Sequence, residues 1–206
     1  MQQQLQLPDS KLATLLVGVV MALLWGAFAY RHMIAFYNTT QWIYLVVCTS
    51  ESLCAAFFVF RSVPKTVSAD PLDWLFAIAG TFLPLFLAPA PWGILPNAKF
   101  LVFFGSVMQI GGLLSLNRSF ALVAARRELK TGGMYRFVRH PLYASYLLIF
   151  TGYVLANTTL TNFALCLMTM GFLYVRLTRE EKHLSKDPTY AEYMRKVPYR
   201  IIPFVF

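Results

Sequence analysis

A chain of 206 residues with 58% hydrophobic and only 13% charged side chains is too apolar for a soluble domain, and its length suits one domain. These values predict an all-α, polytopic integral membrane protein. The net charge of +9 could indicate a nucleic-acid ligand in a soluble protein, but here the basic residues cluster beside apolar runs, where membrane topology and anionic headgroups explain them, so no nucleic-acid partner is expected.

The first 116 residues contain four apolar runs of membrane-spanning length, at residues 12–30, 42–60, 74–95 and 99–116. The first run should end where Arg31 and His32 follow it. Prolines within and just after the third run predict a kink, or an early end of its helix near Leu87. Glu51, near the middle of the second run, should face the interior of the bundle. The fourth run has glycines that allow a neighbouring helix to approach closely, at Gly105, Gly111 and Gly112.

After residue 116, a basic stretch (117–139) precedes two shorter apolar runs, 143–156 and 163–177, which predict a helical hairpin, and a charged, tyrosine-rich tail follows. If six runs cross, sixteen of the eighteen Lys and Arg residues fall on one side. This bias favours an inner-membrane protein with both termini, the basic stretch and the tail in the cytoplasm. If the proline-rich run is re-entrant, five runs cross and the N-terminus lies outside. We treat residues 1–116 as N-terminal spans and 117–206 as the functional portion of the same domain.

The basic stretch leads into the sequence Arg139-His140-Pro141, with Tyr143 two residues further on. The guanidinium of Arg139 is a planar donor suited to a carboxylate or phosphate, and His140 supplies a donor or a titratable nitrogen. Tyr143 adds a ring with a hydroxyl group, and Pro141 suits the first turn of a helix. These residues could hold an anionic ligand, although arginines beside a membrane span are also ordinary topology signals that bind lipid phosphate.

Two adjacent carboxylates, Glu180 and Glu181, follow the last apolar run together with Arg176 and Arg179. Adjacent side chains on a helix point about 100° apart, so at most one of the two carboxylates can face a site. That carboxylate could bind the ammonium group of a ligand whose own carboxylate is held by the basic stretch, because the hairpin returns both segments to one membrane face. The alternative is a solvated helix end with weak surface contacts.

Tyr190 and Tyr193, three residues apart in the tail, would lie on one face of a helix and could cover a pocket or stack on a purine. They could equally belong to an interfacial aromatic belt. His32, His140 and His183 are far apart in the sequence and no metal-ligand spacing is present, so no metal site is expected.

Four motifs stand in this part of the chain: Gly-x-Tyr-Arg-x-x-Arg-His-Pro-x-Tyr at 133–143, Glu-Glu-x-x-Leu at 180–184, Tyr-x-x-Tyr at 190–193 and Val-Pro-x-Arg-x-x-Pro at 197–203. In these motifs the chain resembles the isoprenylcysteine carboxyl methyltransferase family, together with its phospholipid N-methyltransferase relatives. The Arg-His-Pro core also occurs in related membrane sterol reductases that use NADPH. The chain departs from the family pattern at Ser145, where glycine is common, and around Asp187-Pro188, where Phe-Gly commonly precedes the tyrosine pair.

The resemblance implies an S-adenosylmethionine-dependent methyltransferase that acts on a lipophilic acceptor, with a cofactor site open to the cytosol. The cofactor-binding residues that it implies are Gly133, Tyr135, Val138, Arg139, His140, Pro141, Tyr143, Glu180, Glu181, Tyr190 and Tyr193. The catalytic residues that it implies are Arg176, Glu180 and Glu181.

In such a site, His140 or the adjacent backbone suits the carboxylate of the cofactor, and Glu180 or Glu181 suits its ammonium group. Tyrosine rings suit the adenine and tolerate the sulfonium. A carboxylate or thiolate acceptor needs no general base, whereas an amine acceptor must lose a proton, for which the two glutamates and His140 are the candidates. The alternatives are a phospholipid N-methyltransferase, an NADPH-dependent reductase of the sterol type and a non-catalytic membrane protein or small transporter.

Overall fold

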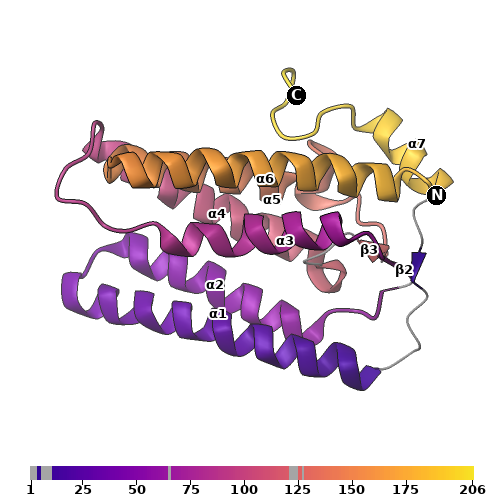
Figure 1. Ribbon diagram of the computed structural model, residues 1–206, viewed down its shortest axis with the longest axis horizontal. Coiled ribbons are helices and arrows are strands. Elements are labelled where there is room, and N and C mark those ends of the chain that lie inside the picture. The colour runs from indigo at the N-terminus through magenta and orange to yellow at the C-terminus, as the bar shows by residue number, and fades with distance from the viewer. Residues whose placement is uncertain (1–3, 6–10, 65, 121–124, 127) are drawn as a thin grey trace.

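The computed structural model describes residues 4–5, 11–64, 66–120, 125–126 and 128–206, which form a bundle of helices with a small sheet at one end (Figure 1). The helices are α1 (Lys11–Thr39), α2 (Trp42–Phe60), α3 (Pro71–Phe82), α4 (Lys99–Leu116), α5 (Pro141–Ala156), α6 (Leu160–Leu184) and α7 (Pro188–Lys196). The antiparallel sheet has the order β1 (Gln4–Leu5), β2 (Thr66–Ser68), β3 (Ala125–Arg126). The predicted all-α fold is confirmed.

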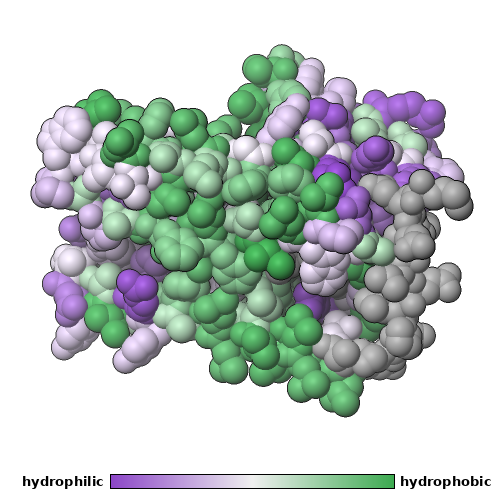
Figure 2. Space-filling model, viewed as in Figure 1, coloured by the Kyte–Doolittle hydropathy of each residue, from purple (hydrophilic) through white to green (hydrophobic). Residues whose placement is uncertain are grey.

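Helices α1 to α6 run along the long axis of the molecule, and α7 lies at the end that also carries the sheet (Figure 1). Among the described residues, α1, α2, α4 and α6 are long and apolar enough to cross a membrane, while α3 with its following turn and α5 are shorter apolar helices. On the face seen in Figure 2, apolar residues cover the middle of the bundle, and hydrophilic residues gather toward its two ends. These features define a polytopic integral membrane protein.

Helix α1 continues to Thr39, so the prediction that it ends before Arg31 and His32 is wrong. Basic residues mark a membrane boundary without breaking a helix, and α1 stops only where Thr40 adopts a positive φ of 54°. Within α1, Nδ1 of His32 lies 2.8 Å from Oε2 of Glu51 on α2. The carboxylate in the middle of α2 therefore has a partner on the neighbouring helix, as a charged group at membrane depth requires.

Helix α3 ends at Phe82 and is followed by a 3₁₀ turn at Leu83–Phe86, which agrees with the early end predicted near Leu87. The extended backbone after this turn takes hydrogen bonds from the connection between α5 and α6. The side chain of Asn162 accepts a hydrogen bond from Ala88 N at 3.1 Å and donates one to Ala88 O at 2.8 Å. A buried amide thus satisfies backbone groups that the prolines have removed from the helical ladder.

Glycines in α4 bring α5 into close contact. A Cβ atom on Gly105 would lie 2.7 Å from Cγ1 of Ile149 and 3.0 Å from the carbonyl oxygen of Ser145, and one on Gly112 would lie 2.8 Å from the side chain of Leu142. Ser145 is fully buried and donates to the carbonyl oxygen of Leu142 at 2.6 Å. The close approach expected from the α4 glycines is therefore present. Ser145, which stands where the family commonly has glycine, does not prevent it.

Helix α3 is joined to α6 by Arg179, whose guanidinium group pairs with Asp70 and Asp73 at the start of α3. Asp70 also caps α3 by accepting from Leu72 N at 2.9 Å, and Asp73 accepts from the hydroxyl of Ser68 in β2. These contacts fix the orientation of the last turns of α6, which carry the glutamate pair.

Replacing Gly105 by Ala should destabilise the protein, because its added methyl group has no free space between α4 and α5. The matched control is Gly171→Ala in α6, since a Cβ atom there would meet nothing within 4 Å and the gain in helix propensity is the same. We expect Gly105→Ala to be the less stable of the two by about 1–3 kcal/mol, measured by thermal unfolding in detergent. Equal unfolding midpoints would contradict the close packing of α4 on α5.

Candidate active site

A buried cluster of charged side chains surrounds Glu181, near the end of α6. Nε of Arg139 donates to Oε1 of Glu181 at 2.7 Å, and Nε2 of His140 lies 3.0 Å from the same oxygen. Nε of Arg200 donates to Oε2 at 2.8 Å. The carboxylate is only 3% exposed, and both of its oxygens are occupied by residues of the protein. Glu181 therefore holds this end of the chain together and is not available to a ligand.

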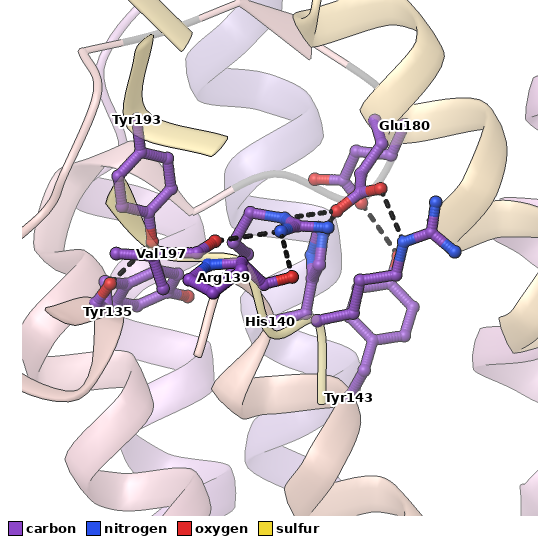
Figure 3. Close-up of polar contacts among 10 residues, drawn as sticks. Tyr135, Arg139, His140, Tyr143, Glu180, Tyr193 and Val197 are labelled. Carbon is purple, nitrogen blue, oxygen red and sulfur yellow. Dashed lines mark hydrogen bonds and ion pairs between the residues drawn. The ribbon is translucent and has the colours of Figure 1, made fainter. Parts of the chain in front are cut away.

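The tail after α7 runs alongside residues 133–140, the basic loop that precedes α5. The backbone N–H groups of Arg139 and His140 donate to the carbonyl oxygens of Tyr199 and Arg200, at 2.9 and 2.8 Å. Nη1 of Arg139 donates to the carbonyl oxygens of residues 197 and 198, at 2.8 and 2.7 Å, and the contact with Val197 is drawn in Figure 3. Because α5 begins with Pro141, His140 stays outside the helical conformation, with φ −130° and ψ 63°, and its backbone N–H group is free to pair with the tail.

Helix α7 is attached to the start of the basic loop. The hydroxyl group of Tyr193 donates to the carbonyl oxygen of Tyr135 at 2.6 Å (Figure 3). Burial raises the pKa of Tyr193 to about 12, even though nearby Arg139 acts in the opposite direction, so this phenol stays protonated as a donor. The loop turns at Gly133, which has a positive φ of 58° and lies so close to Ser115 that no side chain would fit.

A cavity lies between the basic loop, the ends of α4 and α6, and α7. Eight of the residues predicted for the site line it: Tyr135, Arg139, His140, Tyr143, Arg176, Glu180, Tyr190 and Tyr193. The remaining predicted residues, Gly133, Val138, Pro141 and Glu181, do not line it but shape the loop, begin α5 or hold the charged cluster. The rest of the lining is made of Leu116, Ser119, Phe120, Glu128, Leu129, Lys130, Leu142, Tyr146, Leu184 and Asp187.

Glu180 and Arg176 face the cavity from α6, one helical turn apart. Oε2 of Glu180 accepts a hydrogen bond from the hydroxyl of Tyr143 at 2.8 Å (Figure 3). The guanidinium group of Arg176 lies over the same tyrosine ring, 5.6 Å from its centre, and Nη1 donates to Oγ1 of Thr81 at 3.2 Å. Nε of Arg176 is buried and has no hydrogen-bond partner among the described residues. The cavity thus has a carboxylate and an incompletely satisfied cation on adjacent turns of one helix face.

Among the members of this arrangement that were not predicted as site residues, two had a signal in the sequence. Arg200 completes the cluster around Glu181, and its place in the tail motif was the available signal. Tyr146 lines the cavity one turn after Tyr143, so helical spacing could have indicated it. In contrast, Arg179, which the sequence placed beside the glutamates, points away from the cavity toward α3.

Comparison with known proteins identifies the class of this membrane protein. A family model described as phospholipid methyltransferase matches residues 97–191, which include α4, the basic loop, α5, α6 and the start of α7. Protein-S-isoprenylcysteine O-methyltransferase B of Arabidopsis thaliana is 24% identical over 182 residues, a match that covers 84% of this chain and 90% of the plant protein.

Together with the membrane-spanning helices, these matches define an integral membrane methyltransferase. Residues 97–191 thus match the model of the phospholipid methyltransferase family, and the two matches together support a methyltransferase of the isoprenylcysteine carboxyl methyltransferase-like type. The resemblance found in the sequence motifs is therefore confirmed.

The two adjacent glutamates should differ in their effect on stability. Glu181→Gln leaves the buried guanidinium group of Arg139 without its counter-charge and should destabilise the protein by about 3 kcal/mol or more. Glu180→Gln removes an acceptor at a partly exposed position, and the loss should be about 1 kcal/mol. Glu192→Gln, at an exposed surface pair on α7, is the control with no expected loss. Thermal unfolding without ligand measures all three, and equal midpoints for the first two variants would contradict the assignment of Glu181 to the cluster.

Proposed function

We propose that the cavity binds S-adenosylmethionine, which enters from the cytoplasm. The methyl group of this cofactor is transferred to a lipophilic acceptor that comes from the bilayer. The observation that carries this proposal is the separation of the two glutamates. Both carboxylate oxygens of Glu181 are bound by residues of the charged cluster, whereas the carboxylate of Glu180 lines the cavity beside aromatic rings. A cationic, aromatic small molecule is the kind of ligand for which such a lining is suited.

The residues of the cavity fit the parts of this cofactor. Glu180 would bind its ammonium group, held in orientation by the hydroxyl of Tyr143. Tyr135 and Tyr190 offer ring faces for the adenine and for the sulfonium, which supplies the methyl group when bound. His140 has Nε2 engaged by Glu181, so only its second ring nitrogen remains for the cofactor carboxylate.

The acceptor side of the cavity is apolar except for Arg176. Leu116, Phe120, Leu142 and Tyr146 line it and continue into the hydrophobic core between α2, α4 and α5. This wall favours a lipophilic acceptor that reaches the site from within the membrane. The guanidinium group of Arg176, which lines the cavity and whose Nε has no hydrogen-bond partner among the described residues, would bind an anionic group on that acceptor. Such a cation favours a carboxylate over an amine as the methylated group.

A carboxylate acceptor is already nucleophilic, so the chain only has to align it with the methyl group and exclude water. Alignment for an in-line displacement can supply much of the rate in such a reaction. Arg176 and Glu180 lie on adjacent turns of one helix and can therefore hold acceptor and cofactor in a fixed relation. A phospholipid amine as acceptor would instead require Glu180 to accept a proton.

The first test of this proposal is binding of the cofactor. The detergent-solubilised protein should bind S-adenosylmethionine or its demethylated product in calorimetry, and NADPH should not bind. Glu180→Gln should weaken the binding by about 10- to 100-fold, which corresponds to the loss of one charge-assisted hydrogen bond. Glu192→Gln should bind as the parent does. Absence of binding by the parent protein, or unchanged affinity in Glu180→Gln, would contradict the proposal.

The second test separates acceptor binding from cofactor binding. Arg176→Gln should keep the cofactor dissociation constant within about twofold but lower kcat/KM for methyl transfer by about 100-fold, since it removes the cation proposed for the acceptor. The assay uses methyl-labelled cofactor and total membrane lipid with lipidated cysteine derivatives, and the labelled product identifies the acceptor. A labelled phospholipid amine would favour the N-methyltransferase alternative, and full activity of Arg176→Gln would exclude the proposed role of this arginine.

A further inference from the structure

The last six residues, 201–206, form a tight loop that we call the apolar hook. The backbone N–H groups of Ile201 and Ile202 donate to the carbonyl oxygen of Phe206, at 2.8 and 2.9 Å. The N–H group of Phe206 donates back to the carbonyl oxygen of Ile202 at 3.0 Å. The hook therefore has a defined conformation stabilised by its own hydrogen bonds, and its first residue, Ile201, packs against the core formed by Tyr143, Leu173 and Leu177.

The side chains at the tip of the hook are apolar and exposed. Phe204 is 86% exposed and Val205 is 76% exposed. Phe204 also has a positive φ of 65°, which is uncommon for a bulky residue in any solvent. The exposure of two neighbouring large apolar side chains at the tip indicates that the tip of the hook meets an apolar environment.

The hook lies against a part of α6 that faces lipid. The ring of Phe206 stacks on the ring of Tyr174, with their centres 6.2 Å apart and their planes inclined by 30°. Tyr174 is 54% exposed and lies about 15 Å along α6 before its end at Leu184, within the helix that is long and apolar enough to cross the membrane. In Figure 2, apolar side chains gather over the end marked C in Figure 1, where the apolar middle of this face borders hydrophilic residues.

We propose that the apolar hook inserts into the interfacial region of the lipid bilayer beside α6. Aromatic residues are favoured at this depth, and the flanking cations of the tail suit anionic headgroups. The guanidinium group of Arg200 lies 5.0 Å from the centre of the Phe206 ring, so the hook is connected directly to a cation of the charged cluster. The partner of this surface is the bilayer itself.

Insertion of the hook also holds the cavity closed on one side. Arg200 joins Phe206 to Glu181, and the residues just before the hook pair with the backbone of Arg139 and His140. The same tail continues from α7, whose Tyr190 and Tyr193 line the cavity. A bilayer that retains the hook therefore stabilises this wall of the cavity. The consequence for ligand affinity rests on the proposed cofactor site, whereas the insertion itself does not.

Insertion can be tested in nanodiscs of phosphatidylcholine and phosphatidylglycerol. A polarity-sensitive fluorophore is attached to Phe204→Cys in a Cys166→Ser background, since Cys48 and Cys54 are buried. The control has the label at Glu192→Cys, an exposed position on α7. We expect nitroxide lipids to quench the label at 204, and aqueous iodide to quench it about fivefold less than the label at 192. Equal iodide quenching at the two positions would overturn the proposal.

The coupling to the cavity has its own test. Phe204→Ser with Val205→Ser should speed amide hydrogen exchange at residues 139–140 and weaken S-adenosylmethionine binding in nanodiscs by about tenfold. The matched control, Phe204→Trp with Val205→Leu, keeps the apolar character and should behave as the parent does. Unchanged exchange and affinity in the serine variant would overturn the coupling. If nitroxide lipids quench the label at position 204 but the protein binds no cofactor, insertion of the hook is supported and the proposed function is overturned.

Discussion

The arrangement of the site depends on one buried carboxylate. Glu181 comes from α6, Arg139 and His140 from the loop before α5, and Arg200 from the tail, and the two oxygens of this carboxylate join all three segments. A buried charge is costly unless its partners are present with good geometry. The loop, the end of α6 and the tail are therefore expected to adopt their folded positions together. Because α7 is continuous with the tail, the tyrosines on that helix are positioned by the same interaction.

This requirement explains why two adjacent glutamates are needed where one ligand is expected. A carboxylate whose oxygens are both used internally cannot also bind an ammonium group, and a carboxylate left for a ligand cannot hold the tail. Helix geometry separates the two tasks, because neighbouring side chains point in different directions. Glu180 keeps one hydrogen bond from Tyr143 and faces the cavity, while Glu181 faces the cluster. The cation over the Tyr143 ring, Arg176, lies one turn earlier on the face of Glu180.

Hydropathy was sufficient for most helix positions, because an apolar run flanked by polar residues has few other conformations in a membrane. The predicted bounds of α2 and α4 match the structure for this reason. Helix α1 instead continues past Arg31 and His32, because such a basic pair marks the edge of an apolar run and not the end of a helix. The hairpin and the charge bias correctly brought residues 139–140 and 180–181 to one end. Which glutamate faces the cavity could not be predicted, since it depends on the rotation of α6, which Arg179 fixes through contacts with α3. The motifs likewise contain both residues that line the cavity and residues, such as Gly133, that only shape the loop, and the sequence does not distinguish the two.

Every residue that lines the cavity lies within or just after residues 97–191, the part that the family model covers. The side proposed for the acceptor also depends on helices that precede this part, because Arg176 donates to Thr81 on α3 and the apolar wall continues into Cys54 and Phe58 on α2. A change in α2 or α3 can therefore alter the shape and polarity of the acceptor side without disturbing the cluster around Glu181. Under the proposed function, this arrangement would let one methyl-transfer site serve different lipophilic acceptors, which is why the motifs indicate the chemistry but not the acceptor.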